Sequence, residues 1–354
     1  MLGEAARYFV KIGRNDVAEK LYNERQKLFN PVKRNELSVR YVKNAPDDVG
    51  SWLASPLLKD LSNRGNVTSE YGAKEAAFLV TDVMAAGRNV GDSSVKADKE
   101  TYFYVCYDEY GIHLFFVGVD SKVKDVMAKR INGSGYEMYL ALGEGGPSYQ
   151  WLFDQPKDNL YSPPWNSPHE YYRNLNDYVD ISSRPVENGI ATAMNFSWDL
   201  AYDRLPENGD LWPFELIRWT RGGGVTWGGK SVWQIGNWGR LKFEGLDDEV
   251  LTRIRSIIIY KALARYNEQK IARSGGAIAI WQDEELGDPD FYKQCLAPEV
   301  ERLDQLSKLV GDEMDKATVD KLWVEAVPVW FDFEYKAAKL REDYLRNNFI
   351  LNLK

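Results

Sequence analysis

The alternation of apolar and polar positions predicts a β-rich middle part, from about residue 36 to residue 245. Short runs of apolar, β-branched and aromatic residues are separated there by Gly, Asn, Asp and Pro. Such runs are typical of strands, and many short strands with turn signals predict an antiparallel β-sandwich. The segment 101–119 predicts a hairpin that turns at Asp108–Gly111. The predicted strands are Glu36–Val42, Ala77–Val80, Thr101–Tyr107, Ile112–Val119, Tyr136–Leu142, Tyr149–Phe153, Tyr178–Ser182, Gly189–Phe196, Phe214–Trp219 and Gly239–Phe243.

Helical spacing marks the N-terminal end of the chain. Apolar residues recur at helical intervals on both sides of Gly13, and Asp16 suits an N-cap. Residues 1–31 therefore predict a helical hairpin that ends at Asn30-Pro31. The stretch G-R-N-D-x-A-x-x-x-Y (13–22) resembles half of a tetratricopeptide repeat, so we expect the hairpin to be the end of a helical repeat.

The C-terminal part, residues 247–354, also has helical spacing. A first helix is expected after Asp247-Asp248, and a second has Pro298 near its N-terminus. A third helix is expected to have Thr318 as its cap and to run towards Leu345 with a kink at Pro328. The predicted fold class is therefore α+β, an antiparallel β-sandwich flanked by a helical hairpin and a helical region.

Composition and charge narrow the function classes. The chain has 354 residues, of which 44% are hydrophobic and 28% charged, as in soluble globular proteins. A net charge of −8 argues against nucleic acid and anionic membranes as partners, and no apolar run is long enough to span a membrane. The charged N-terminus does not read as a signal peptide and looks like the inside of a helix, so we expect a fragment or a processed form.

The cysteines and histidines give little support to catalysis. Cys106 lies in an apolar run and predicts a buried thiol, and with Cys295 it makes no disulfide framework. His113 and His169 have no neighbours at metal-ligand spacing. The chain has no G-x-S-x-G, P-loop or G-x-G-x-x-G motif, and Gly222–Gly224 precede a strand-like stretch rather than a helix. Carboxylates are plentiful, so a glycan-active hydrolase or lyase stays open as an alternative.

Aromatic residues are the unusual feature. The chain has 12 Trp and 21 Tyr, and six of the Trp fall between Trp198 and Trp238. They have two interpretations, because Trp fills cores and also stacks on the C–H faces of sugar rings. The polar and aromatic loops Thr220–Gly229 and Tyr161–Tyr172 suit the second interpretation, since long loops on a rigid sheet carry function.

The order of several short motifs resembles the family 9 carbohydrate-binding modules, which share their sandwich with DOMON-like domains. The motifs are NAPDDVGSW (Asn44–Trp52), VCYDEYGIHLFFVGVDSK, GYEMYLAL with Glu137 at the family Glu position, Phe196-Ser197-Trp198, Pro206 with Gly209, a strand ending in Arg218, Thr226-Trp227 and the closing Trp238–Phe243. The resemblance covers about residues 36–245. It departs from the family at Gly135 and at Asp47–Val49, and the segment Gln150–Asp177 has no counterpart.

The resemblance implies non-catalytic binding of a glycan by aromatic stacking and hydrogen bonds, without a cofactor. The expected contact residues are Trp165, Arg218, Arg221, Trp227 and Trp238. Structural roles stay open for three of them, Arg218 as a buried or edge ion pair that holds the sheet, Trp227 as a structural residue and Trp238 as a plug of the sandwich.

Some family members bind structural calcium, and the departures from the family pattern leave no ligands to name here. DOMON-like relatives can hold haem, and a haem site in this chain would use His113 with a distant Met as axial ligands. We rank haem below a sugar as the ligand. A third alternative is an interaction scaffold, in which the helical ends extend a solenoid. A glycan binder is expected in the periplasm or outside a bacterium.

Overall fold

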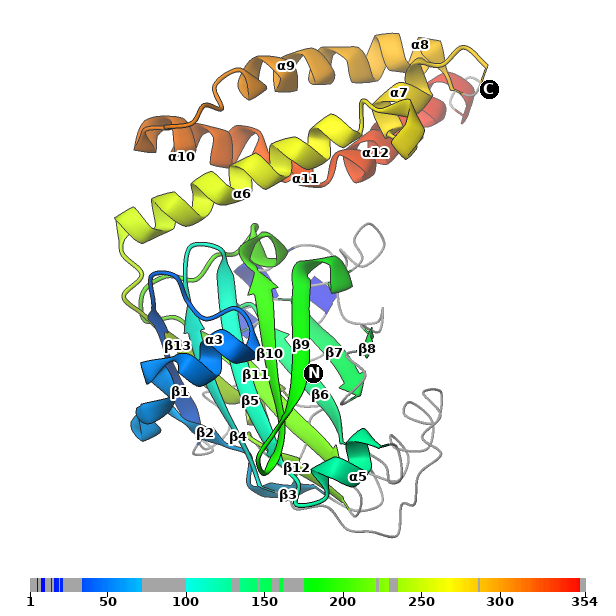
Figure 1. Cartoon of the computed structure of the whole chain (residues 1–354). Helices are drawn as coiled ribbons and strands as arrows, with labels where there is room; N and C mark the ends of the chain where they lie inside the picture. Colours follow the sequence, from blue (N-terminus) through cyan, green and yellow to red (C-terminus); the bar gives the residue numbers. More distant parts are fainter. Residues whose placement is uncertain are drawn as a thin grey trace. The chain divides into compact units, whose positions relative to one another are not determined.

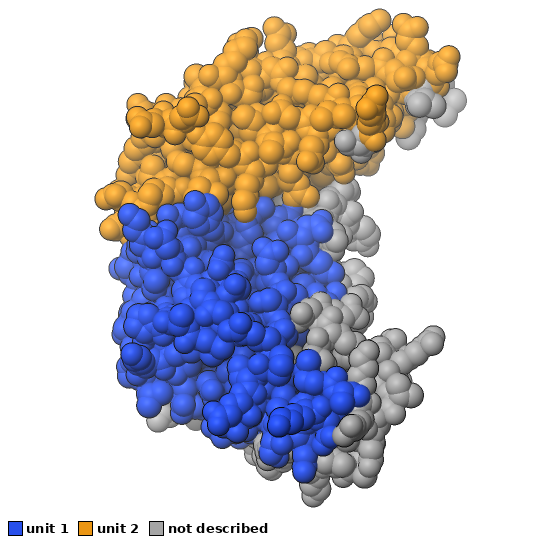
Figure 2. Space-filling model, in the orientation of Figure 1, with its two compact units in different colours: residues 1–246 blue, residues 247–354 orange. Residues whose placement is uncertain are grey.

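The computed structural model describes residues 34–71, 100–128, 134–144, 147–154, 159–161, 175–220, 223–228, 235–285 and 287–350, with isolated positions between 5 and 21. The chain forms two compact units, residues 1–246 and 247–354 (Figure 2). Most of the predicted N-terminal hairpin and the predicted strand Ala77–Val80 lie outside the described residues.

The first unit is built on one curled β-sheet (Figure 1). Its path runs in the order β8-β7-β6-β11-β13-β1-β4-β5-β10-β9, with β12 and β3 continuing from β11 and β2 pairing with β4. The described strands are β1 (Glu36–Tyr41), β2 (Gly65–Asn66), β3 (Ser69–Tyr71), β4 (Thr101–Tyr107), β5 (Gly111–Val119), β6 (Gly135–Ala141), β7 (Ser148–Asp154), β8 (Asn159–Tyr161), β9 (Val179–Val186), β10 (Gly189–Ser197), β11 (Leu211–Thr220), β12 (Gly223–Thr226) and β13 (Gly239–Glu244).

Short helices connect these strands. They are α3 (Val49–Ala54), α5 (Val123–Met127) and the single turns η1 (Pro56–Lys59), η2 (Leu61–Asn63), η5 (Leu175–Tyr178), η6 (Trp198–Ala201) and η7 (Ile235–Asn237). The predicted hairpin is confirmed, because β4 and β5 pair antiparallel and Asp108 donates its backbone N–H to the Gly111 carbonyl at 3.0 Å.

The sheet is mixed, which corrects the purely antiparallel prediction. Strand β1 pairs in parallel with β13 on one side and with β4 on the other. It thereby joins two antiparallel groups of strands through hydrogen bonds into one sheet, where a sandwich of two separate sheets was expected. Parallel pairing needs a long crossover, and such distant partners leave no local signal in the sequence.

The curl of the sheet encloses the main core. Phe116 of β5 lies 5.5 Å from Phe153 of β7, and Trp151 of β7 lies 5.0 Å from Phe196 of β10, measured between ring centroids. Strand β7 is far from both β5 and β10 along the hydrogen-bonded path. The rings therefore meet across the interior, as in the core of a sandwich. This core buries much of the aromatic excess, including Trp198 and the other interior rings Trp151, Trp212 and Trp227.

Helix α3 covers the opposite face of the sheet at β4, β5 and β10. Trp52 of α3 stacks on Phe115 at 5.5 Å, and Cys106 is buried in the same cluster. The Asp48 side chain caps the helix by accepting from the Ser51 N–H at 2.6 Å. Cys106 is the buried thiol that the sequence predicts.

The second unit is helical, as predicted. Its helices are α6 (Asp248–Glu268), α7 (Ala277–Gln282), α8 (Pro289–Phe291), α9 (Ala297–Ser307), α10 (Lys316–Glu325), α11 (Val327–Phe331) and α12 (Phe333–Leu345), with the single turns η8 (Ala272–Ser274), η9 (Tyr292–Leu296) and η10 (Arg346–Ile350). Asp247 caps α6, and Pro298 lies in the first turn of α9. Buried residues of this core include Ile254, Tyr266, Leu303, Leu322 and Trp330.

The third predicted helix needs two corrections. Asp315, rather than Thr318, is its N-cap, because the Asp315 carboxylate accepts the Thr318 N–H at 2.8 Å. The segment up to Leu345 is also three helices rather than one kinked helix. Pro328 lies in the first turn of α11, where its missing N–H costs nothing.

Candidate functional site

The strand register places two carboxylates on the face of β6, β7 and β11 that points away from the main core. Ile217 of β11 is opposite Glu137 of β6, and Glu215 is opposite Tyr139. Residues two apart in a strand share a face. This face therefore carries Glu137, Tyr139, Gln150, Glu215, Ile217 and Trp219, and Trp238 packs beside them. We call this group the Glu137 cluster.

Glu137 is the centre of the cluster. Its carboxylate accepts hydrogen bonds from the Tyr139 hydroxyl, from Gln150 Nε2 at 2.5 Å and from the Trp219 indole N–H at 3.1 Å. The side chain is only 1% exposed. Burial raises the pKa of Glu137 above its ordinary value, and the three hydrogen bonds offset only part of that increase. A buried carboxylate with a shifted pKa on a rigid strand is a functional-site candidate.

Glu215 holds the chain where β12 ends. Its carboxylate accepts the backbone N–H groups of Trp227 and Gly228, each at 2.8 Å, and Asn35 Nδ2 donates to the Trp227 carbonyl. Glu137 likewise holds Trp219, one residue before the end of β11. The two carboxylates thus fix the chain just before residues 221–222 and 229–234, which the structure does not describe.

Arg218 lies inside the sheet with 1% exposure. Its guanidinium donates to Ser134 Oγ at 3.0 Å, to the Glu100 and Val119 carbonyls at 2.9 Å each, and to Thr101 Oγ1 at 3.2 Å. These acceptors are neutral and come from segments that the sheet brings together. In place of the ion pair that was the structural alternative for Arg218, hydrogen bonds to neutral acceptors crosslink the ends of β4, β5 and β6 to β11.

Two of the predicted tryptophans are also interior. Trp227 is 3% exposed, and its ring packs against Phe103 at 5.0 Å and Phe214 at 5.8 Å. Trp238 is 2% exposed and lies 4.9 Å from the Tyr139 ring. Their positions favour the structural interpretations that the sequence left open. The predicted loop Thr220–Gly229 contains strand β12, a further difference from the expectation. Trp165 and Arg221 lie outside the described residues.

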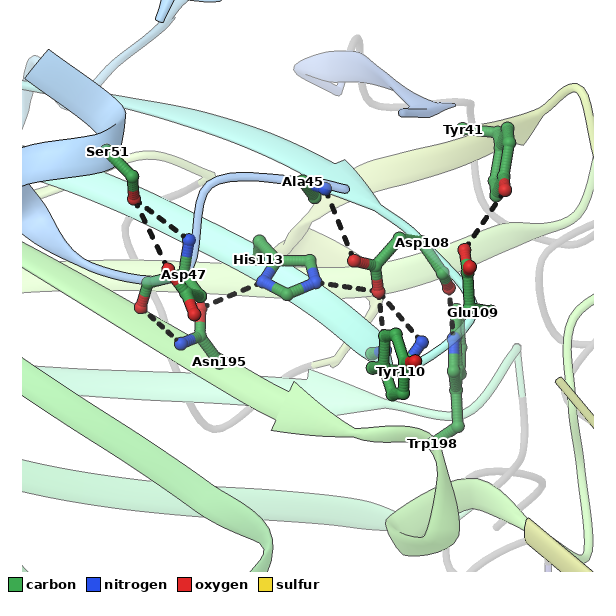
Figure 3. A network of polar contacts seen from close by, with 11 residues as sticks. Tyr41, Ala45, Asp47, Ser51, Asp108, Glu109, Tyr110, His113, Asn195 and Trp198 are labelled. Atoms are coloured by element: carbon green, nitrogen blue, oxygen red, sulfur yellow. Dashed lines mark hydrogen bonds and ion pairs between the residues drawn. The ribbon is translucent and has the colours of Figure 1, made fainter. Parts of the chain in front are cut away.

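A second polar network lies at the hairpin turn (Figure 3). His113 Nε2 is 2.9 Å from Asp108 Oδ1, and His113 Nδ1 is 3.0 Å from Asn195 Oδ1. The Asp108 carbonyl accepts the Trp198 indole N–H at 2.7 Å. Both ring nitrogens of His113 thus have protein partners, so this side chain does not offer the axial ligand that a haem would need.

The described part of the chain holds neither a group of metal ligands nor a membrane-spanning helix. No group of three or more His, Cys, Asp or Glu side chains is arranged there to hold an ion, so no calcium ligands can be named. Among the same residues, no helix has the length and apolar character needed to span a bilayer.

Sequence reasoning missed Glu215 and Gln150 as partners in the site. Each is a polar residue that alternates with core residues along its strand. This alternation was the signal in the sequence that could have identified them. Glu137 was noted from its motif alone. The partners of these side chains come from neighbouring strands, and only the register reveals them.

Comparisons with known proteins give a structural likeness. No family model matches the chain, and no curated protein matches its sequence. A family 9 carbohydrate-binding module from Caldicellulosiruptor kristjanssonii, solved in complex with glucose, is similar over 60% of this chain and 98% of its own, with 10% identity and a TM-score of 0.41. The structure of such a module from the same organism with cellotriose is similar over 61% of this chain and 96% of its own, with 12% identity and a TM-score of 0.36.

Proposed function

We propose that the chain binds carbohydrate without breaking a bond, through one side chain in the segment that follows the Glu137 cluster and one in the predicted loop Tyr161–Tyr172. Arg221 comes two residues after Trp219, so the anchored end of β11 leads directly into it. Arg221 and Trp165 are the proposed contacts, a guanidinium for sugar hydroxyls and an indole face for sugar C–H groups. Arg218, Trp227 and Trp238 are assigned to the frame that supports them.

The observation that carries the proposal is the use of two buried carboxylates as anchors. Burying a carboxylate costs free energy that an apolar side chain would avoid. Glu137 and Glu215 are both held in the sheet and both hydrogen-bond to residues next to the Trp- and Gly-rich segments. Precise support of loop ends by buried polar groups is what a binding site on loops requires.

The test is a glycan array with the purified chain, followed by calorimetric titration of the glycans that bind. Trp165→Ala and Arg221→Ala are expected to weaken binding by about tenfold or more while leaving the thermal midpoint unchanged. Trp323→Ala and Arg184→Ala are matched controls, because Trp323 lies in α10 of the second unit and Arg184 is exposed on β9. These controls are expected to bind like the parent chain.

Three outcomes would contradict the proposal. The first is an array on which the folded chain binds no glycan. The second is equal loss of affinity in the site variants and the controls. The third is release of reducing ends from a bound polysaccharide, which would show that the chain is an enzyme.

A further inference from the structure

The Asp108–His113–Asn195 network fastens a separate segment of the chain to the sheet (Figure 3). That segment, the entry segment, is residues 45–54 and includes α3. The Ala45 N–H faces Asp108 Oδ2 at 3.3 Å, and the Asp47 carbonyl accepts from Asn195 Nδ2 at 2.5 Å. His113 lies between Asp108 and Asn195 and is 5% exposed. Its two ring nitrogens therefore complete the connection.

The orientation of the Asn195 amide follows from its other partner. A backbone carbonyl can only accept, so the Asn195 atom facing the Asp47 carbonyl must be the N–H-bearing Nδ2. The amide oxygen then faces His113 Nδ1 at 3.0 Å. This oxygen has no proton to give, so the hydrogen bond forms only when Nδ1 carries a proton.

Asp108 requires a proton on the other ring nitrogen. Its Oδ1 already accepts the backbone N–H groups of Tyr110 at 2.8 Å and Gly111 at 3.1 Å, and its Oδ2 faces the Ala45 N–H. Burial acts to raise the pKa of Asp108, but the hydrogen bond and charge of His113 and the turn N–H groups outweigh it, so this pKa lies below its ordinary value. Asp108 is thus an ionised acceptor, and His113 Nε2 must donate to it.

We propose that His113 is a buried imidazolium whose charge fastens the entry segment to the sheet, and that its deprotonation loosens this segment. The neutral ring has one N–H and cannot serve both acceptors. Its bare nitrogen would face a lone pair of Asp108 or Asn195 at about 3 Å, which is repulsive. When Nε2 keeps the proton, relief requires the Asn195 amide to turn, and that movement gives up the bond to the Asp47 carbonyl.

Other ionisable groups lie on the elements around His113. Burial raises the pKa of the Cys106 thiol, the register partner of His113 on β4, so it stays neutral. The carboxylates and the cation around the network are Asp108 and Glu109 at the turn, Asp47 and Asp48 at the start of α3, Asp180 opposite Asn195 on β9, and Arg184 beside Gly50.

Nuclear magnetic resonance of the full chain tests the charge directly. The chain has two histidines, so 15N imidazole spectra contain two sets of signals, and His169→Gln assigns them. We expect both His113 nitrogens to show imidazolium shifts under conditions where the protein is folded. Backbone amide shifts of residues 45–54 are expected to change with the same midpoint as the His113 ring. A single neutral tautomer with both contacts intact would overturn the proposal.

Hydrogen exchange supplies a second readout. Protection factors of the amides in α3 are expected to fall by about tenfold as the His113 ring loses its proton, the equivalent of one charged hydrogen bond. His113→Gln should remove this pH dependence, and His169→Gln should keep it. Equal pH dependence in the parent chain and in His113→Gln would overturn the proposal. If His113→Gln does not fold, the parent chain alone provides the test, by comparing the protection factors of α3 with the titration of the His113 ring. Unchanged protection across that titration would also overturn the proposal.

Discussion

Gly239 lies directly against the indole ring of Trp227 in the interior of the first unit. A Cβ placed on Gly239 would overlap the six-membered part of that ring. Phe103 and Phe214 also pack against the indole, with ring centroids 5.0 and 5.8 Å away, and Trp227 is 3% exposed. The glycine at the start of β13 is therefore required by close packing.

Gly239→Ala is expected to lower the free energy of unfolding by about 1–3 kcal/mol, the usual cost of an extra carbon in a filled core. Urea unfolding followed by tryptophan fluorescence would measure the change. Gly311→Ala is the control, because a Cβ there has open space around it. A Gly239→Ala variant as stable as the parent would show that Trp227 is not packed as described.

Arg218→Met is expected to lower the free energy of unfolding by about 3 kcal/mol or more. The change removes the Arg218 donor from the Val119 carbonyl and from the buried Ser134 hydroxyl, and each buried group left unpaired costs about 1–3 kcal/mol. Equilibrium unfolding in urea measures the loss. Arg40→Met is the matched control, since the Arg40 side chain is 56% exposed and pairs with Asp60 at 3.5 Å. Its loss should be about 0–1 kcal/mol. Equal losses in both variants would mean that the buried hydrogen bonds of Arg218 stabilise the fold no more than the exposed ion pair of Arg40 does.

Most strands could be predicted because their signal is local. The β4–β5 hairpin combines alternating aromatic residues with an Asp-started turn, and both are visible within nineteen residues (101–119). Strand β12 was missed because Gly223 and Gly224 lack strand propensity and owe their conformation to pairing with β11. Helix α3 was missed because six residues are too few to show a repeated helical period. The Asp48 cap is its only local sequence signal.

The candidate site was harder to predict because its contacts join distant segments. Tryptophan suits both a core and a sugar platform, and the sequence cannot tell which neighbours surround Trp227. Arg218 was expected to contact a glycan, with an ion pair as the alternative, yet its partners include backbone carbonyls, which every residue possesses. The Glu137 cluster depends on register, which is set by strands 13 and 82 residues away at Gln150 and Trp219.

Glu137→Gln is expected to change how stability depends on pH. The folded pKa of Glu137 is raised, so the folded chain binds this proton more tightly than the unfolded chain. Stability from this group is therefore greatest at low pH and falls as the pH rises from the ordinary carboxyl range through the folded pKa. Glu137→Gln should remove that fall, which urea unfolding at a series of pH values would measure.

A control of opposite sign exists at Glu244, whose pKa is lowered first by its hydrogen bond with Lys242. Its contribution is present at neutral pH and is lost on acidification, so Glu244→Gln should flatten the acid side of the profile. If Glu137→Gln leaves the pH profile of the parent chain unchanged, Glu137 is not the buried titrating group that the structure indicates.

The helical unit, residues 247–354, is expected to fold by itself because it has its own core. Trp330 is 1% exposed and stacks on Tyr266 with ring centroids 6.2 Å apart. The isolated segment should give a helical circular dichroism spectrum and one cooperative thermal transition. Within it, Trp330→Ala should cost about 3–5 kcal/mol, whereas Val324→Ala, at a side chain that is 75% exposed, should cost about 0.5 kcal/mol or less. A gradual, non-cooperative melt of the segment would mean that this core does not suffice for folding.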